Sequence, residues 1–216
     1  AENVFPNLNH MYDYENDTLI DLNANSHLEN ENILRFAALA SETDPFDAME
    51  QAIWEAYDLY SDKKIRGEFM MIYEYPLQGR PPMMTHVYQY NNLKIVAGKG
   101  ALERIIAICN LRDNDKNKIA NQGKFLAMHG YRVIAVASAV HNNIDFPISQ
   151  DDFNWHFEGL LALYDPTRKG LDKIIGQFYD ANIRVKLITG DYPETAINIA
   201  GKVGIPQPGS PIAGGH

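Results

Sequence analysis

Two short apolar runs near the C-terminal end constrain the fold more than any other feature of this chain. The first run, residues 157–164, ends at Asp165, and the second, residues 185–188, ends in a turn that contains Asp191. Between them, residues 171–178 carry apolar side chains at helical spacing. Buried parallel strands end in this way when they deliver polar groups to a site at their carboxyl ends. The pattern therefore predicts a β-α-β crossover whose strand ends carry function.

Three short motifs carry a resemblance to a known family. Asp165-Pro166-Thr167-Arg168 resembles the Asp-Pro-x-Arg hinge motif of P-type cation-transporting ATPases. Thr189-Gly190-Asp191 with Thr195-Ala196 resembles their Thr-Gly-Asp-x-x-x-Thr-Ala signature, and Lys99-Gly100-Ala101 resembles their Lys-Gly-Ala nucleotide-binding motif. The motifs occur in the family's order, so the resemblance spans most of the chain.

The order of predicted elements indicates an α/β chain with two architectures. Strands arranged as hairpins precede residue 145, which predicts an antiparallel sheet with flanking helices for residues 1–152. The resemblance implies that this part is the nucleotide-binding domain. It implies that residues 153–216 are part of the phosphorylation domain, a Rossmann-like unit of the haloacid-dehalogenase type.

Local patterns predict the individual elements. Asp44 followed by Pro45 is typical of a helix start, so we expect a helix that Asp44 caps and that ends near residue 60. Asn91-Asn92 has the length of a hairpin turn. The other expected elements are strands at 69–75, 83–90, 93–97 and 131–138, and helices at 33–40, 101–109 and 116–129.

Composition excludes several classes of protein. The net charge of −9 argues against nonspecific binding to nucleic acid or to an anionic membrane. No apolar run approaches the roughly 20 residues of a membrane helix, so we expect the 216-residue chain to be soluble. Cys109 is the single cysteine and lies in an apolar helical run, which favours a buried structural thiol.

Two family motifs are missing from the sequence. It lacks Asp-Lys-Thr-Gly-Thr, whose Asp is phosphorylated in the family, and the later Gly-Asp-Gly-x-Asn-Asp of the metal site. The resemblance implies that the chain is a cytoplasmic part of an integral membrane protein, with a bacterial cell membrane as the expected location. It also implies that Ala1-Glu2-Asn3 follows the phosphorylation site. In the intact pump, ATP and Mg²⁺ would be the cofactors, and the transported cation would bind in membrane helices that this chain does not contain.

The resemblance assigns nucleotide-binding roles in the first domain. Lys99 would line an adenine pocket, and Gly100 would permit close approach of the ligand. Asp47 would lie near the adenine amino group, and Arg132 would contact a phosphate. From the residues alone, alternatives stay open: Lys99 lies between a predicted strand and helix and fits a solvated turn, and Arg132 fits an exposed strand edge.

The segment from Glu74 to Met84 departs from the family's pattern. Many relatives have a Phe here that stacks on adenine, and a Lys before Met. This chain offers Tyr75 or Leu77 for stacking, with Arg80 as a partial substitute for the missing cation. Aromatic stacking contributes about 0.5–1.5 kcal/mol beyond area burial, so we expect weak nucleotide binding.

The catalytic assignments rest on the two C-terminal motifs. The resemblance implies that Thr189, Gly190 and Asp191 surround the phosphoryl group and Mg²⁺. It implies that Asp165 forms part of a hinge and that Arg168 belongs to the nucleotide site. The histidines show no metal-ligand spacing, so the sequence predicts no metal site within the chain.

The predicted function is that of the ATP-binding part of a P-type ion pump that forms an aspartyl-phosphate on a residue outside this chain. Two alternatives remain. One is a free-standing phosphatase of the dehalogenase superfamily with a cap domain, which requires an Asp-x-Asp nucleophile motif, and we identify none. The other is a noncatalytic nucleotide-binding module.

Overall fold

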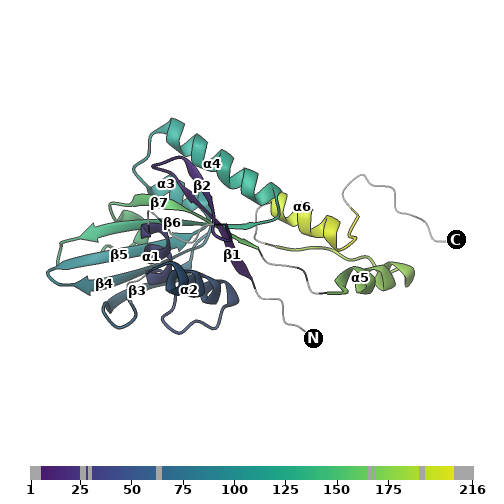
Figure 1. Cartoon of the computed structure of the whole chain (residues 1–216), viewed down its shortest axis with the longest axis horizontal. Coiled ribbons are helices and arrows are strands. Elements are labelled where there is room, and N and C mark those ends of the chain that lie inside the picture. The colour runs from purple at the N-terminus through teal and green to yellow at the C-terminus, as the bar shows by residue number, and fades with distance from the viewer. Residues whose placement is uncertain are drawn as a thin grey trace.

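One antiparallel sheet of seven strands forms the centre of the part of the chain that the structure describes (Figure 1). The computed structural model describes residues 6–24, 28, 31–61, 65–164, 167, 169–189 and 193–206. The strand order is β2-β1-β7-β6-β5-β4-β3. The strands are β1 (Asn7–Asp13), β2 (Thr18–Asp21), β3 (Met70–Gln78), β4 (Met83–Tyr90), β5 (Leu93–Gly100), β6 (Arg132–His141) and β7 (His156–Tyr164). The expected antiparallel sheet is confirmed.

Helices cover both faces of this sheet. The helices α1 (Asn32–Leu39) and α2 (Ala48–Tyr60) share one apolar core with Val136, Leu161 and Leu163. The helices α3 (Leu102–Ile108) and α4 (Asp113–Met128) share a second core with Leu160, Ala162 and Ala135. Successive residues of a strand point to opposite faces, so β6 and β7 supply alternate side chains to the two cores.

The strand β7 corrects the predicted β-α-β unit. It pairs antiparallel with β1 on one edge and with β6 on the other, and seven consecutive residues, 157–163, are buried. The continuous apolar run thus reflects burial on both faces, not parallel pairing. Because both edges of β7 are occupied, no edge remains for a parallel partner, and the prediction is wrong for this strand.

The C-terminal part adds two helices beside the sheet. The helix α5 (Leu171–Asp180) lies where helical spacing predicted one, and α6 (Pro193–Lys202) continues along the line of α4 in Figure 1. The Asn198 side chain donates to the Met128 carbonyl at 3.2 Å, which joins α6 to the end of α4. Residues 183–189 form no strand, so the expected haloacid-dehalogenase-type unit is not observed in the described residues.

The hairpin prediction and the cysteine prediction are confirmed. Asn91 has a φ of 53° in the turn between β4 and β5, a left-handed conformation that Asn tolerates well. Cys109 is buried at the end of α3, and burial raises the pKa of its thiol to about 12. A thiol of this kind is a packing residue.

Candidate functional site

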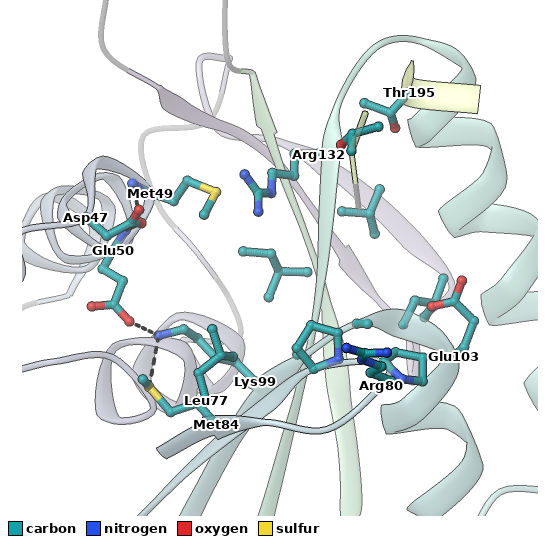
Figure 2. Close-up of a pocket in the computed structure, with 18 of the residues that line it drawn as sticks. Asp47, Met49, Glu50, Leu77, Arg80, Met84, Lys99, Glu103, Arg132 and Thr195 are labelled. Carbon is teal, nitrogen blue, oxygen red and sulfur yellow. Dashed lines mark hydrogen bonds and ion pairs between the residues drawn. The ribbon is translucent and has the colours of Figure 1, made fainter. Parts of the chain in front are cut away.

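A cavity of about 910 Å³ lies between the start of α2, the β3–β4 connection, the end of β5, the start of β6 and the segment around α6. Figure 2 shows Glu50 and Lys99 at one side of it and Arg132 and Thr195 at the opposite side. Six of the predicted site residues line this cavity: Asp47, Leu77, Lys99, Gly100, Arg132 and Thr189. Five segments that are separate in sequence therefore meet at one place.

Lys99 lies inside the sheet, which excludes the alternative of a solvated turn. It belongs to β5, where it pairs with Met84 of β4 and Val136 of β6. The strand β5 continues to Gly100, because a residue without a side chain lets its backbone approach that of residues 82–83 closely. A Cβ on Gly100 would lie 2.6 Å from the Pro82 carbonyl oxygen. The close approach at Gly100 is thus made by the neighbouring strand.

The ammonium group of Lys99 is held by acceptors of the protein. It pairs with the Glu50 carboxylate and donates to the Ala40 carbonyl at 2.8 Å and to Ser41 Oγ at 3.0 Å. Lys99 and Glu50 are each 8% exposed. Burial lowers the pKa of Lys99, and the Glu50 charge opposes that shift. An ammonium has three donors, and these three contacts use all of them.

Asp47 caps the helix that begins at the cavity. Its Oδ1 accepts from the backbone N–H groups of Met49 at 3.0 Å and Glu50 at 3.2 Å, so α2 begins at Ala48. The prediction that Asp44 caps this helix is wrong. Asp47 and Glu50 have the spacing of a capping box, a signal that sequence reasoning missed. The cap also places Glu50 within reach of Lys99.

Arg132 and the rim formed by the β3–β4 connection supply two more cations. Arg132 is the first residue of β6 and is half-buried there. Arg80 lies in the connection between β3 and β4. Arg104 of α3, which sequence reasoning missed, fixes that connection: it donates to the carbonyls of Gln78 and Pro81 at 3.0 Å and pairs with Asp151.

A bulge in β3 directs the side chains of Tyr75 and Leu77 to different places. The pairing with β4 shifts between Tyr75 and Gln78, and a bulge of this kind changes the direction of the side chains that follow it. Tyr75 is 4% exposed within the second core, with its hydroxyl donating to the Pro147 carbonyl at 2.5 Å. Leu77 is 62% exposed and lines the cavity. Of the two predicted stacking residues, the structure brings only Leu77 to the site.

The predicted C-terminal site residues are described only in part. Thr189 lines the cavity, and so does Thr195, whose hydroxyl donates to the Tyr131 carbonyl at 3.2 Å. Asp165, Arg168, Gly190 and Asp191 lie outside the described residues.

One stretch, which sequence reasoning missed, does have the Asp-x-Asp spacing of the phosphatase alternative. Asp113-Asn114-Asp115 forms the first turn of α4, and Asp115 pairs with Arg112 on the surface. A nucleophile of that alternative would follow a strand, so this stretch does not support a phosphatase.

Comparison with known protein families decides the assignment. The model of the family described as "P-type ATPase, cytoplasmic domain N" matches residues 21–170, more than half of the chain. The chain belongs to this family. The matched region contains every lining residue of the cavity from Asp47 to Ile134, while Thr189, Pro193 and Thr195 lie beyond it.

Curated relatives of this P-type ATPase chain carry the same assignment. It is 31% identical over 180 residues to a cation-transporting ATPase of Methanocaldococcus jannaschii, covering 81% of this chain and 20% of the relative. It is 28% identical to a calcium-transporting ATPase of Bacillus cereus, covering 92% and 24%, and 34% identical to a sodium/potassium exporting P-type ATPase of Schizosaccharomyces pombe, covering 62% and 14%. The chain thus spans a quarter or less of the length of these relatives.

No helix in the described part of the chain combines the length and the apolar character needed to cross a bilayer.

Proposed function

We propose that the cavity binds ATP and that the chain is the nucleotide-binding part of a P-type cation pump. The observation that carries this proposal is the cavity itself, which brings together Lys99, Arg132 and Leu77 inside the region of the family match. Its volume of about 910 Å³ lies within the range of ligand pockets, roughly 300–1,000 Å³.

The lining favours one orientation of the nucleotide. Met49, Ile53, Leu77 and Met84 provide apolar surface for an adenine ring. The stem of Lys99 adds to that surface, because its charge is already balanced by Glu50. Asp47 keeps acceptor capacity beyond its two backbone bonds, which suits the adenine amino group.

The arginines suit the anionic end of the ligand. Hydrogen bonds between a guanidinium and a phosphate are charge-assisted and are stronger than neutral ones. Arg132 and Arg80 line the same cavity from separate elements, so a triphosphate directed toward them would meet two cations. Mg²⁺ would accompany the phosphates and neutralise part of their charge.

In the whole protein we expect ATP hydrolysis to be coupled to cation transport. The γ-phosphate would pass to an Asp outside this chain, and phosphoryl transfer depends mainly on positioning and charge neutralisation. Thr189, Gly190 and Asp191 would surround the phosphoryl group, with Asp165 and Arg168 at a hinge. This chain would be a cytoplasmic portion of a membrane protein. Since β7 belongs to the sheet, we place the domain boundary after Tyr164.

The test is a titration of the chain with ATP, followed by NMR. Backbone amides around the cavity should shift, with a Kd on the order of 1 mM, about −4 kcal/mol. Arg132→Gln should weaken ATP binding about 10-fold, since a hydrogen bond to a charged group contributes ~1.5–3 kcal/mol. The same substitution should weaken AMP binding less than ATP binding, because AMP carries fewer phosphate charges.

Arg112→Gln is the matched control, since this arginine side chain is 87% exposed and does not line the cavity. It should leave ATP binding unchanged. Equal weakening by Arg132→Gln and Arg112→Gln, or amide shifts that avoid the cavity, would contradict the proposal.

A further inference from the structure

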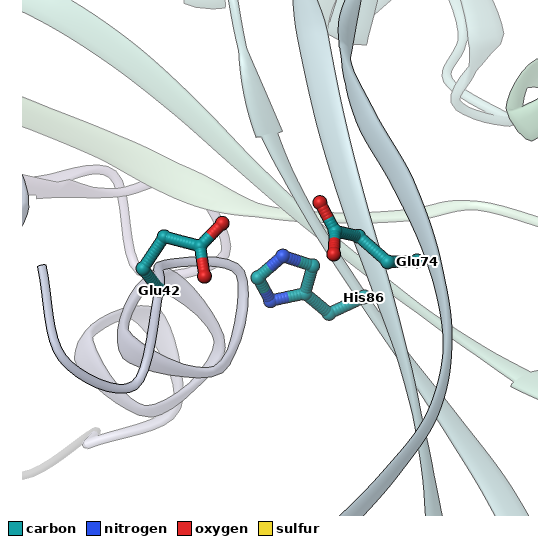
Figure 3. A group of neighbouring side chains, drawn as sticks. All are labelled: Glu42, Glu74 and His86. Atoms are coloured by element: carbon teal, nitrogen blue, oxygen red, sulfur yellow. The ribbon is translucent and has the colours of Figure 1, made fainter.

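Three side chains outside the cavity converge on one point. Glu42 comes from the connection between α1 and α2, Glu74 from β3 and His86 from β4. Their possible ligand atoms all lie within 4.8 Å of one another. Figure 3 shows the imidazole ring of His86 between the two carboxylates. Because the three residues are distant in sequence, no local spacing revealed them.

The imidazole of His86 has one satisfied and one unsatisfied nitrogen. Nδ1 lies 2.9 Å from the Leu39 carbonyl oxygen, which can only accept, so Nδ1 carries the proton. The side chain is 0% exposed, and Nε2 is buried without a hydrogen-bond partner among the described residues. Leaving such an atom unsatisfied costs ~1–3 kcal/mol and calls for an explanation.

We propose that Glu42, Glu74 and His86 form a binding site for a divalent transition-metal ion, with Zn²⁺ as the best-suited cation. One imidazole nitrogen with two carboxylates is a donor set that suits Zn²⁺, whereas Mg²⁺ and Ca²⁺ prefer oxygen alone. Metal-binding histidines characteristically donate their other ring N–H to a carbonyl or carboxylate. The bond from Nδ1 to Leu39 is such a contact.

The geometry requires only small side-chain movements. Two ligands of a tetrahedral Zn²⁺ at ~2.1 Å from the metal lie ~3.4 Å apart, so the present donors need to close by roughly 1.4 Å at most. Glu74 is exposed and Glu42 is half-buried, whereas His86 is fixed in the sheet. The carboxylates can therefore rotate onto a metal that enters from solvent.

This site adjoins the cavity without sharing its lining. The backbone N–H of Glu42 donates to Glu50 Oε2 at 3.2 Å, and Glu50 holds Lys99. None of the three metal-site residues lines the cavity itself. Zn²⁺ binding can therefore be measured without nucleotide, and its failure would not bear on the proposed ATP site.

The experiment is calorimetric titration of the chain with Zn²⁺ in a non-chelating buffer. We expect a saturable site with one equivalent of Zn²⁺ and a change in the ¹⁵N shift of His86 Nε2. Glu74→Gln should weaken this site at least 10-fold, and because Glu74 is exposed the variant should fold normally. Glu42→Gln tests the second carboxylate in the same way.

Glu55→Gln is the matched control, since Glu55 is an exposed carboxylate on α2 outside the cluster. It should bind Zn²⁺ as the parent chain does. Equal loss in Glu55→Gln and Glu74→Gln, Zn²⁺ binding that leaves the Nε2 signal unchanged, or displacement of Zn²⁺ by an equal concentration of Mg²⁺ would overturn the proposal.

Discussion

Replacing Lys99 by Met should destabilise the fold far more than an ordinary loss of a surface charge. The substitution removes the ion-pair partner of a Glu50 that is 8% exposed, and two further acceptors lose their donor. Removing one partner of a buried ion pair costs about 3–5 kcal/mol, because the remaining charge stays in a poorly solvated place. For a chain of this size that corresponds to a fall in Tm of ~6–20 °C.

Urea unfolding followed by circular dichroism measures this loss. Lys118→Met is the matched control, because Lys118 and its partner Asp17 are 42% and 59% exposed, and such a pair contributes about 0.2–1 kcal/mol. The double variant Lys99→Met with Glu50→Gln should recover part of the loss, since it removes the orphaned charge.

A loss for Lys99→Met no larger than that for Lys118→Met would refute this reasoning, because it would mean that the pair is solvated. The prediction also limits how Lys99 can be used in binding studies. A variant that unfolds loses ATP binding because it no longer has a cavity. Arg132 is therefore the better residue to substitute in a test of the cavity.

Three further predictions concern the cap, a strand glycine and a buried carboxylate. Asp47→Ala should cost ~1 kcal/mol in urea unfolding through loss of the cap, whereas Asp44→Ala should change stability by less than about 0.5 kcal/mol; the reverse order would restore Asp44 as the cap. Gly100→Ala should lower the free energy of unfolding by ~1–3 kcal/mol, because its Cβ would collide with the backbone of the neighbouring segment. Gly176→Ala should leave stability unchanged or raise it, because a Cβ there would have nothing within 4 Å. Equal effects of the two substitutions would contradict the close approach at Gly100. Burial raises the pKa of Glu158 above its ordinary value, so the folded state binds the proton more tightly than the unfolded state and loses stability as pH rises through the folded pKa. Glu158→Gln should remove that decline and raise the free energy of unfolding at pH 7, measured by urea unfolding across the pH range. A variant with the same pH profile as the parent chain would show that Glu158 does not cause the decline.

The sequence predicted most elements of the sheet but not the direction in which the interior strand β7 pairs with its neighbours. The run at β7 is apolar throughout because helices cover both faces of the sheet, and periodicity reports burial without reporting the direction of the neighbours. The family motifs placed Arg132 and Lys99 at one cavity, which the strand patterns alone did not do.

Two site features depended on contacts that no local pattern contains. Lys99 appeared to lie in a turn because glycine flanks it on both sides, yet those glycines permit the close packing of β5. The choice between Tyr75 and Leu77 depended on a bulge, which is set by the register with β4. The group of Glu42, Glu74 and His86 likewise comes from three separate segments, so spacing along the chain gave no indication of it.

The ion pair between Lys99 and Glu50 constrains how a nucleotide can lie in the cavity. Glu50 receives the Lys99 ammonium through one oxygen and the Glu42 backbone N–H through the other, so this wall is close to neutral. A ligand that presented a phosphate here would have to displace a carboxylate from a buried ammonium, at a cost comparable to breaking the pair. An uncharged ring displaces nothing and covers apolar surface. The phosphates should therefore point toward Arg132, which makes the orientation of the nucleotide a consequence of a structural ion pair.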